Sequence, residues 1–322
     1  MKISYLLLFI AIGLFTLPVF GQFRVKPVEK KQLDPNELSE EAIDRLKNSQ
    51  TVFFYRADDD LIELRKALED VWTISDLILI PFSEAGSIDL TGKSFFVIEG
   101  LRKVVKQYAT VDNSYLFLHL YMSLPDKNGK EFVQSFARLD LFPSEEAMRA
   151  MATMSESEIF VYLYGDAEIN NWTPGFLRNY FRNINDLLEK GEGKGLYKGI
   201  DDVPAIARMA NKTLYIPEYA LEKRSKMFGL VAGSEDPEKL MKNYPYPHEF
   251  KTACQISDAI IAGEDFYYLV YTRSSSEKFF TVFHSTSGEI VFNAYKPMSY
   301  NLKSKDLKDV AKAVKKMKKK EG

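Results

Sequence analysis

The sequence predicts an α/β fold, with α+β as the alternative, arranged as two modules that each contain a mixed sheet. Near both ends of the chain, short apolar runs typical of strands alternate with amphipathic helical patterns. Two other segments have the pattern of antiparallel strands, a hairpin in the first module and a three-strand meander in the second. We therefore predict both parallel and antiparallel strand pairing.

The first module is expected to span residues 51–225 and to open with a strand, a helix and a strand. Residues 51–55 are apolar and β-prone, and residues 74–81 form a nearly continuous apolar run. Such a run is typical of a parallel strand that is buried on both faces. Between the two runs, four apolar residues recur at helical spacing: Leu61, Leu64, Leu68 and Val71.

The antiparallel hairpin is the clearest local pattern in the chain. Residues 115–124 and 131–142 are two strand-like runs, and Asn128-Gly129 lies between them. Asparagine and glycine readily adopt the positive φ angles that a tight hairpin turn requires. A further strand is predicted at residues 94–98.

A helical insertion is predicted to complete the first module. Ser144 is a suitable cap for a short helix, and Thr173-Pro174 begins a longer one. Residues 159–164 are predicted as another strand between these helices.

The second module, residues 226–322, is smaller and is expected to end in a basic helix. Asp236-Pro237 begins a short helix, and the meander comprises residues 266–271, 278–284 and 289–294. The order of strand, acidic residues and helix resembles that of residues 55–60 and their surroundings. This shared order suggests a remote duplication of one module.

The N-terminus is predicted to direct export. Residues 1–21 resemble a cleavable signal peptide: Lys2 precedes a 13-residue apolar run at positions 5–17, and Pro18 follows it. The run is shorter than the ~20 apolar residues that a membrane span needs, although an uncleaved anchor is the alternative. Residues 22–50 are predicted as a polar leader with one helix, capped by Asp34.

The cysteine content indicates the compartment. Cys254 is the single cysteine, so the chain can form no intrachain disulfide and has no lipid-attachment cysteine near the cleavage point. An exported protein without disulfides is typical of a bacterial envelope, so we expect the periplasm or the exterior of a Gram-negative bacterium. Cys254 itself is expected to be a small buried side chain.

Charge is distributed unevenly along the chain. Residues 303–322 carry nine lysines and three acidic residues, a net of +6, so the remainder carries −8 of the total of −2. The acidic body argues against nucleic acid as a partner. The basic helix has a narrow apolar stripe, Leu307, Val310, Ala311, Val314 and Met317, which favours docking on the body; peripheral contact with anionic lipid is the alternative.

Asp58, Asp59 and Asp60 are the candidate catalytic residues. They follow the first strand, where α/β proteins often bind ligands, and paired carboxylates could serve a hydrolase. The competing interpretation, which the sequence favours, is that Asp58 or Asp59 caps the following helix and that all three interact with its positive end.

A metal site has one weak candidate. Met148, Met151 and Met154 recur every three residues and could offer thioethers to Cu(I), although methionine at this spacing more often fills a core. No histidine pair has the spacing of metal ligands, and no cofactor motif is evident.

Aromatic residues suggest a binding surface. Tyr244, Tyr246 and His248 lie in a proline-rich bend, and together with Trp172 they could offer faces to a sugar or a peptide. The competing interpretation, which the sequence favours, is a rigid turn whose tyrosines pack on the body.

These observations favour a non-enzymatic envelope protein that binds a partner protein or a glycan through an exposed sheet edge or an aromatic surface. An envelope hydrolase using Asp58–Asp60 is the alternative, and metal handling by the methionines is a third hypothesis.

Overall fold

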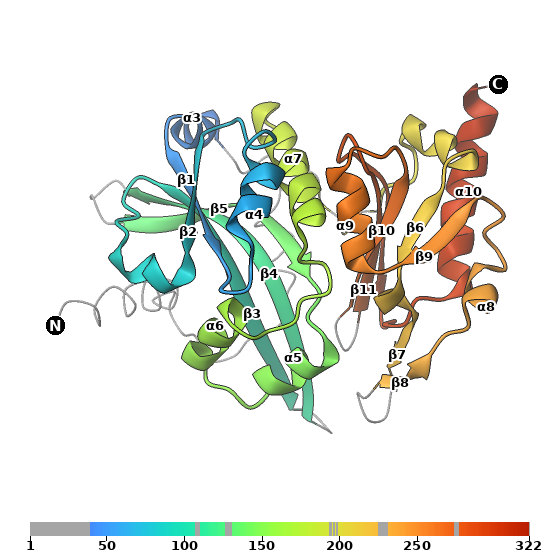
Figure 1. Cartoon of the computed structure of the whole chain (residues 1–322), viewed down its shortest axis with the longest axis horizontal. Helices are drawn as coiled ribbons and strands as arrows, with labels where there is room; N and C mark the ends of the chain where they lie inside the picture. The colour runs from blue at the N-terminus through green and yellow to red at the C-terminus, as the bar shows by residue number, and fades with distance from the viewer. Residues whose placement is uncertain are drawn as a thin grey trace.

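A computed structural model describes most of the chain after residue 38, namely residues 39–106, 110–125, 131–192, 195, 197, 199–224, 231–273 and 277–321. It confirms the α/β class, with two mixed five-stranded sheets and helices packed around them (Figure 1). The predicted signal peptide, the Asp34 cap and the Asn128-Gly129 turn lie outside the described residues. Within those ranges, no helix has the length and apolar character that crossing a membrane would require.

The first sheet has the strand order β2-β1-β3-β4-β5. β1 pairs in parallel with both β2 and β3, and the remaining pairs are antiparallel, so the predicted hairpin strands are confirmed as β4 and β5. The bounds are β1 Gln50–Tyr55, β2 Asp76–Pro81, β3 Ser94–Lys106, β4 Thr110–Pro125 and β5 Glu131–Leu141.

The second sheet has the order β12-β11-β10-β6-β9. The predicted meander is confirmed as its antiparallel part, whereas β6 lies parallel to both β10 and β9. β6 precedes residue 226 in the chain, yet its partners follow that position. The bounds are β6 Leu214–Pro217, β9 His248–Lys251, β10 Tyr267–Arg273, β11 Glu277–His284 and β12 Ile290–Pro297, beside a separate ribbon of β7 Glu222–Arg224 and β8 Val231–Ser234.

Most of the α-helices begin at a side-chain cap that the sequence supplies. Ser144, Thr173 and Asp236 each accept a hydrogen bond from a backbone N–H of the first turn, as predicted. The α-helices are α3 Glu40–Lys47, α4 Leu61–Leu68, α5 Glu145–Met151, α6 Glu156–Tyr164, α7 Pro174–Glu189, α8 Pro237–Met241, α9 Ala253–Ile261 and α10 Ser304–Glu321, and the 3₁₀ helices are η2 Phe82–Ser87, η4 Pro204–Ala210 and η5 Glu218–Leu221.

The strand predicted at residues 159–164 is wrong, because this segment belongs to α6. Ser155 and Glu158 form a reciprocal capping box that starts the helix. The burial also follows helical spacing: Ile159 and Leu163 are buried, whereas Val161 is 71% exposed. A strand would have placed these three side chains on the same face.

Cys254 is exposed, contrary to the expected burial. It lies in the first turn of α9, and the buried residues of that helix start two positions later at Ile256. The solvent-facing side of this turn therefore carries the thiol.

Helix α7 lies between the two sheets and contributes to one core that spans both (Figure 1). On one side the Phe181 ring meets Phe53 and Phe96, with centroids 5.3 and 4.3 Å away. On the other side Phe176 stacks on Tyr268 of β10 at 5.2 Å. The two predicted modules are thus joined by a shared helix.

The start of α7 packs very closely against α9. The Gly175 N–H donates to Ser257 Oγ at 2.9 Å, and a Cβ on Gly175 would lie 2.6 Å from the Ser257 carbonyl oxygen. Only glycine permits this approach, because the obstructing atoms belong to the backbone and cannot rotate away.

We expect Gly175→Ala to lower the free energy of unfolding by about 1–3 kcal/mol, since α7 and α9 must separate to admit the methyl group. Gly195→Ala is the matched control, because a Cβ there meets nothing within 4 Å. Chemical denaturation measures both variants, and equal stabilities would contradict this packing.

Helix α10 is docked on the second sheet through a buried ion pair. Lys278 Nζ binds Asp306 Oδ2, and these side chains are only 1% and 7% exposed. Four residues of the predicted apolar stripe are buried, Leu307, Val310, Val314 and Met317, whereas Ala311 is half-buried and Ala313 is buried in addition. The docked interpretation of this helix is therefore confirmed.

Asp306→Ala should destabilise the protein by about 3–5 kcal/mol, because it leaves the Lys278 ammonium buried without its counter-charge. Asp309→Ala removes a more exposed carboxylate on the same helix and should cost less than about 1 kcal/mol. The double change Lys278→Met with Asp306→Leu should recover much of the lost stability in the same denaturation assay. If the double variant is no more stable than Asp306→Ala, the destabilisation does not come from an unpaired Lys278 charge.

Candidate functional site

The β2 edge, the outer side of Asp76–Pro81, is the candidate site. β2 pairs with β1 over six positions, from Gln50↔Asp76 to Tyr55↔Pro81, and none of the described strands pairs with its other side. Along the β2 edge, backbone N–H and C=O groups that point away from β1 lack a neighbouring strand. Such groups can form hydrogen bonds with an added polypeptide strand.

The side chains of this strand are apolar and only partly buried. They pack against the core on one side and remain accessible on the other: Leu77, Ile78, Leu79 and Ile80. The parallel pairing with β1 follows the prediction, but the prediction of burial on both faces is wrong. β2 lies at the end of the sheet, so one side of each residue lacks the neighbour that would cover it.

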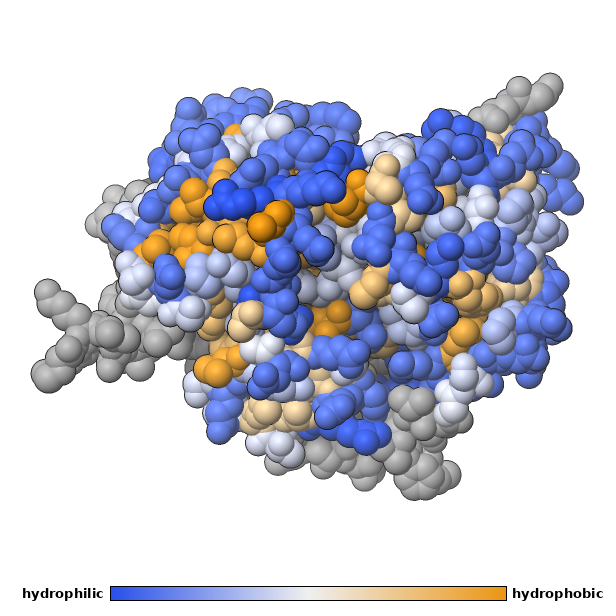
Figure 2. Space-filling view, viewed as in Figure 1, coloured by the Kyte–Doolittle hydropathy of each residue, from blue (hydrophilic) through white to orange (hydrophobic). Residues whose placement is uncertain are grey.

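The β2 edge belongs to a wider apolar area of the surface. Figure 2 shows an orange region over the part of the first lobe where β2 and α4 are drawn in Figure 1. Ile62 on α4 is 78% exposed, the second most exposed large apolar side chain among the described residues. Contiguous apolar surface of this kind is typical of an interaction site.

The carboxyl end of β2 is held rigidly. Phe82 follows the strand and stacks on Tyr164 of α6 with ring centroids 3.7 Å apart, while Phe54 of β1 meets its edge. Pro81 has no backbone N–H and ends the strand. These contacts fix the direction of β2 relative to the sheet.

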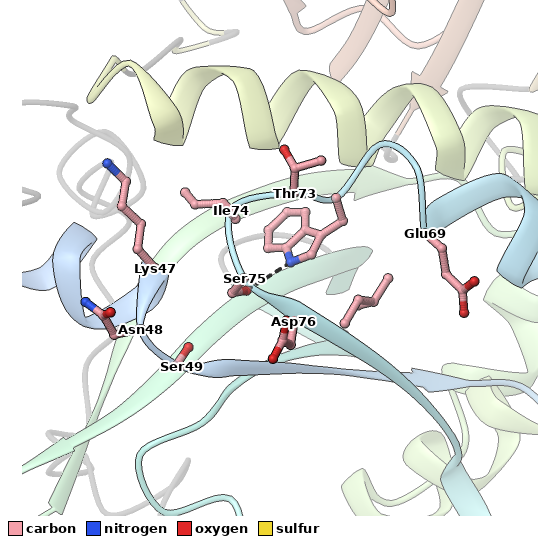
Figure 3. Close-up of a pocket in the computed structure, with 10 residues that line it drawn as sticks. Lys47, Asn48, Ser49, Glu69, Thr73, Ile74, Ser75 and Asp76 are labelled. Carbon is pink, nitrogen blue, oxygen red and sulfur yellow. Dashed lines mark hydrogen bonds between the residues drawn. The ribbon is translucent and has the colours of Figure 1, made fainter.

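An open pocket of about 700 Å³ lies at the amino end of β2. Its walls come from the end of α3, the start of β1 and the segment that leads into β2. Figure 3 shows Lys47 and Glu69 on opposite sides of it, with Ser75 and Asp76 between them. The lining residues are Lys47, Asn48, Ser49, Glu69, Trp72, Thr73, Ile74, Ser75, Asp76 and Leu77.

A chain of hydroxyl groups joins the amino ends of the three parallel strands beside this pocket. Thr51 Oγ1 lies 2.6 Å from Ser94 Oγ and 2.5 Å from Ser75 Oγ. Trp72 Nε1 donates to Ser75 Oγ at 3.1 Å, which is the dashed line in Figure 3. Thr51 and Ser94 are fully buried. The chain satisfies polar groups that would otherwise be costly to bury.

The pocket is lined mainly by polar and charged side chains. Its lining residues include the Glu69 and Asp76 carboxylates, and the Ser75 hydroxyl contacts an indole and a second hydroxyl. Asp76 and Lys47 are exposed at the rim and offer charges of opposite sign. The pocket therefore presents polar atoms beside the apolar β2 edge.

The three aspartates bind different partners. Asp60 caps α4 by accepting from the N–H groups of Ile62 and Glu63, so the cap is confirmed but the expectation that Asp58 or Asp59 forms it is wrong. Asp59 accepts from Arg56 N at 2.8 Å and from Trp172 Nε1 at 2.9 Å. Asp58 lies 3.4 Å from the buried Arg56 guanidinium.

Asp59 is partly buried, unlike the exposed Asp58 and Asp60. Burial raises its pKa above the ordinary range, although the two hydrogen bonds and the Arg56 charge oppose this effect. The three carboxylates thus hold the turn after β1 together and connect it to Trp172.

The binding candidates Trp172, Tyr244, Tyr246 and His248 do not form one exposed surface. Trp172 is buried and stacks on Phe53 at 5.8 Å within the first core, and Tyr244 is also buried. Tyr246 is partly exposed and His248 is exposed. The expectation that Trp172 and Tyr244 offer exposed faces is wrong, because both rings are covered by the packing of their own lobes.

The methionine candidates pack into the protein interior. Met148 and Met151 are buried on α5, while Met154 is partly buried beyond the end of that helix. Across the described ranges, no three His, Cys, Asp or Glu residues are grouped so that they could hold a metal ion.

A cluster of titratable residues on β3 and β4 was not predicted from the sequence. His119 Nδ1 binds Glu99 Oε2, and the Tyr121 hydroxyl donates to the same carboxylate at 3.0 Å. Burial and the Glu99 charge raise the pKa of Tyr121. The alternation of a strand places His119 and Tyr121 on one face, but only the strand register brings Glu99 beside them.

Comparison with known proteins identifies no relative. No protein-family model matches the chain, and neither the curated proteins nor the solved structures contain a significant match. Function must therefore be argued from the site.

The Trp172–Asp59 hydrogen bond should make stability depend on pH. Trp172→Phe removes a donor to a charged group, a loss of about 1.5–3 kcal/mol at neutral pH in addition to lost packing. Because burial raises the pKa of Asp59, this carboxyl is protonated at a higher pH than an ordinary aspartate, and the loss should shrink as the pH falls.

Trp72→Phe is the matched control, because its indole N–H donates to the neutral Ser75 hydroxyl. Urea denaturation at several pH values measures both variants. A cost of Trp172→Phe that does not change with pH relative to the control would contradict a bond to an ionised carboxylate.

Proposed function

We propose that this protein is a non-enzymatic binding protein that accepts an extended segment of a partner polypeptide along the β2 edge. The observation that carries the proposal is the combination of an edge strand, whose outer side pairs with no described strand, and four successive partly exposed apolar residues, 77–80. An added strand would satisfy the outward backbone groups and cover these side chains at once.

The lack of protection along the β2 edge supports this proposal. Soluble proteins usually guard an open edge with lysine, an inward-facing charge, a bulge or an early proline. Over residues 77–80, β2 has none of these and its pairing with β1 is regular; a charge and a proline occur only at its two ends, Asp76 and Pro81. An edge left in this form is suited to recognition by strand addition.

A polypeptide fits the β2 edge better than a glycan does. Sugars are usually held by exposed aromatic faces and convergent polar groups, whereas this edge is lined by aliphatic side chains. The adjacent pocket would receive the polar residues at one end of the bound segment. The partner would be another protein of the envelope, if the predicted export of the chain holds.

The alternative functions gain less support. The hydrolase hypothesis relied on Asp58–Asp60, and Asp60 is engaged as a helix cap while Asp59 binds Trp172. The metal hypothesis relied on methionines of which two are buried. We therefore propose no catalytic residue and no cofactor.

Selection of random linear peptides, long enough to span the six residues of β2, provides a defined probe for the proposal. Selected peptides should contain alternating apolar residues and should bind the full chain. Ile78→Lys and Leu79→Lys should each weaken that binding about tenfold or more, because each removes an apolar contact worth about 1.5–3 kcal/mol when buried.

These two positions distinguish strand addition from other docking. Neighbouring residues of a strand point to opposite faces of the sheet, so only a ligand that lies along the edge contacts both. Val161→Lys on α6 is the control, since it places the same charge at an exposed apolar position away from β2. Equal losses at Val161, or a loss at only one β2 position, would overturn the proposal.

A further inference from the structure

One side of α10 carries a continuous row of lysines, which we call the basic face. Five of its lysines recur at alternating spacings of three and four residues and therefore share one side of the helix: Lys305, Lys308, Lys312, Lys315 and Lys319. All five are exposed. From Lys305 to Lys319 the row is about 20 Å long at the rise of an α-helix.

The basic face points directly away from the protein. The buried residues Leu307, Val310 and Val314 have the same spacing but lie on the opposite side of the helix, where they pack on the body. The Lys278–Asp306 ion pair fixes the rotation of α10 about its axis. The lysines are consequently held outward by the fold and do not depend on a mobile tail for their presentation.

Few of these charges are neutralised within the protein. Among the five, Lys312 has an acidic neighbour, Asp309, at 3.7 Å. The neighbouring acidic residue Asp309 also pairs with Lys296. Within the described part of the chain, no ion pair involves Lys305, Lys308, Lys315 or Lys319.

We propose that the basic face of α10 docks the protein on an anionic lipid surface. Each lysine near such a surface gains about 1 kcal/mol, so a row of five supplies a substantial attraction without any specific pocket. The apolar side of α10 is already buried against the second sheet, so the helix touches the headgroups without inserting.

The composition of the helix favours lipid over the other polyanions. α10 contains no arginine and no aromatic residue. Recognition of nucleic acid commonly uses arginine forks or stacked aromatic rings, and a specific acidic protein needs a shaped apolar centre as well as charge. A row of flexible ammonium groups requires only a dense array of negative charges, which a membrane surface provides.

This contact would leave the β2 edge accessible. Figure 1 shows α10 on the outer side of the second lobe and β2 in the other lobe, with α7 between them. The proposal rests on α10 alone and is independent of strand binding at β2.

Vesicle co-sedimentation of the full chain tests the proposal. Vesicles of phosphatidylcholine are compared with vesicles in which a third of the lipid is phosphatidylglycerol. The triple variant Lys308→Gln, Lys315→Gln and Lys319→Gln should bind the anionic vesicles about 100-fold more weakly, at about fivefold for each lysine. High salt should abolish the same difference, because the screening length falls from about 10 Å at 0.1 M to about 3 Å at 1 M.

The control is a charge-matched triple variant in the first lobe, Lys47→Gln, Lys66→Gln and Lys190→Gln, at three exposed positions. It should retain binding, and the phosphatidylcholine vesicles measure any contribution from the apolar N-terminal run, which all variants share. Equal binding by the two triple variants, or equal binding to both vesicle types, would overturn the proposal. Thermal denaturation verifies that both triple variants fold.

Discussion

The packing of α7 between the two sheets is the constraint on which the rest of the structure depends. Its phenylalanines join both cores, and its polar side chains also fix the approach to β2. Asn185 Oδ1 accepts hydrogen bonds from Thr73 N at 2.8 Å and from Ile74 N at 2.9 Å. These residues lead directly into β2, so the helix that unites the modules also sets the position of the candidate binding edge.

The sequence predicted the elements whose signals are local. The β4–β5 hairpin, the meander and the capped helix at Thr173-Pro174 follow from alternation and capping alone. Residues 159–164 were misassigned because a short apolar run suits either a strand or a helix. The Ser155–Glu158 capping box was the available signal that distinguishes them.

The candidate site could be predicted only in part. An apolar run at residues 74–81 indicates a strand, but its place in the sheet depends on the order in which distant strands pair. The cluster of Glu99, His119 and Tyr121 could not be predicted for the same reason, because it depends on the register in which β3 and β4 pair. Local patterns also could not decide whether Trp172 and Tyr244 face solvent, because burial of an aromatic ring depends on tertiary packing.

Strand addition at the β2 edge is the central claim, and residue-resolved hydrogen exchange along β2 tests it most directly. In the free protein, the β2 amides that are hydrogen-bonded to β1 should be protected from exchange with solvent, and the outward amides should exchange rapidly. A bound peptide should then protect the outward amides of residues 76–80. Strand addition would be contradicted if the outward amides are already protected without peptide, or if they stay unprotected when peptide is bound.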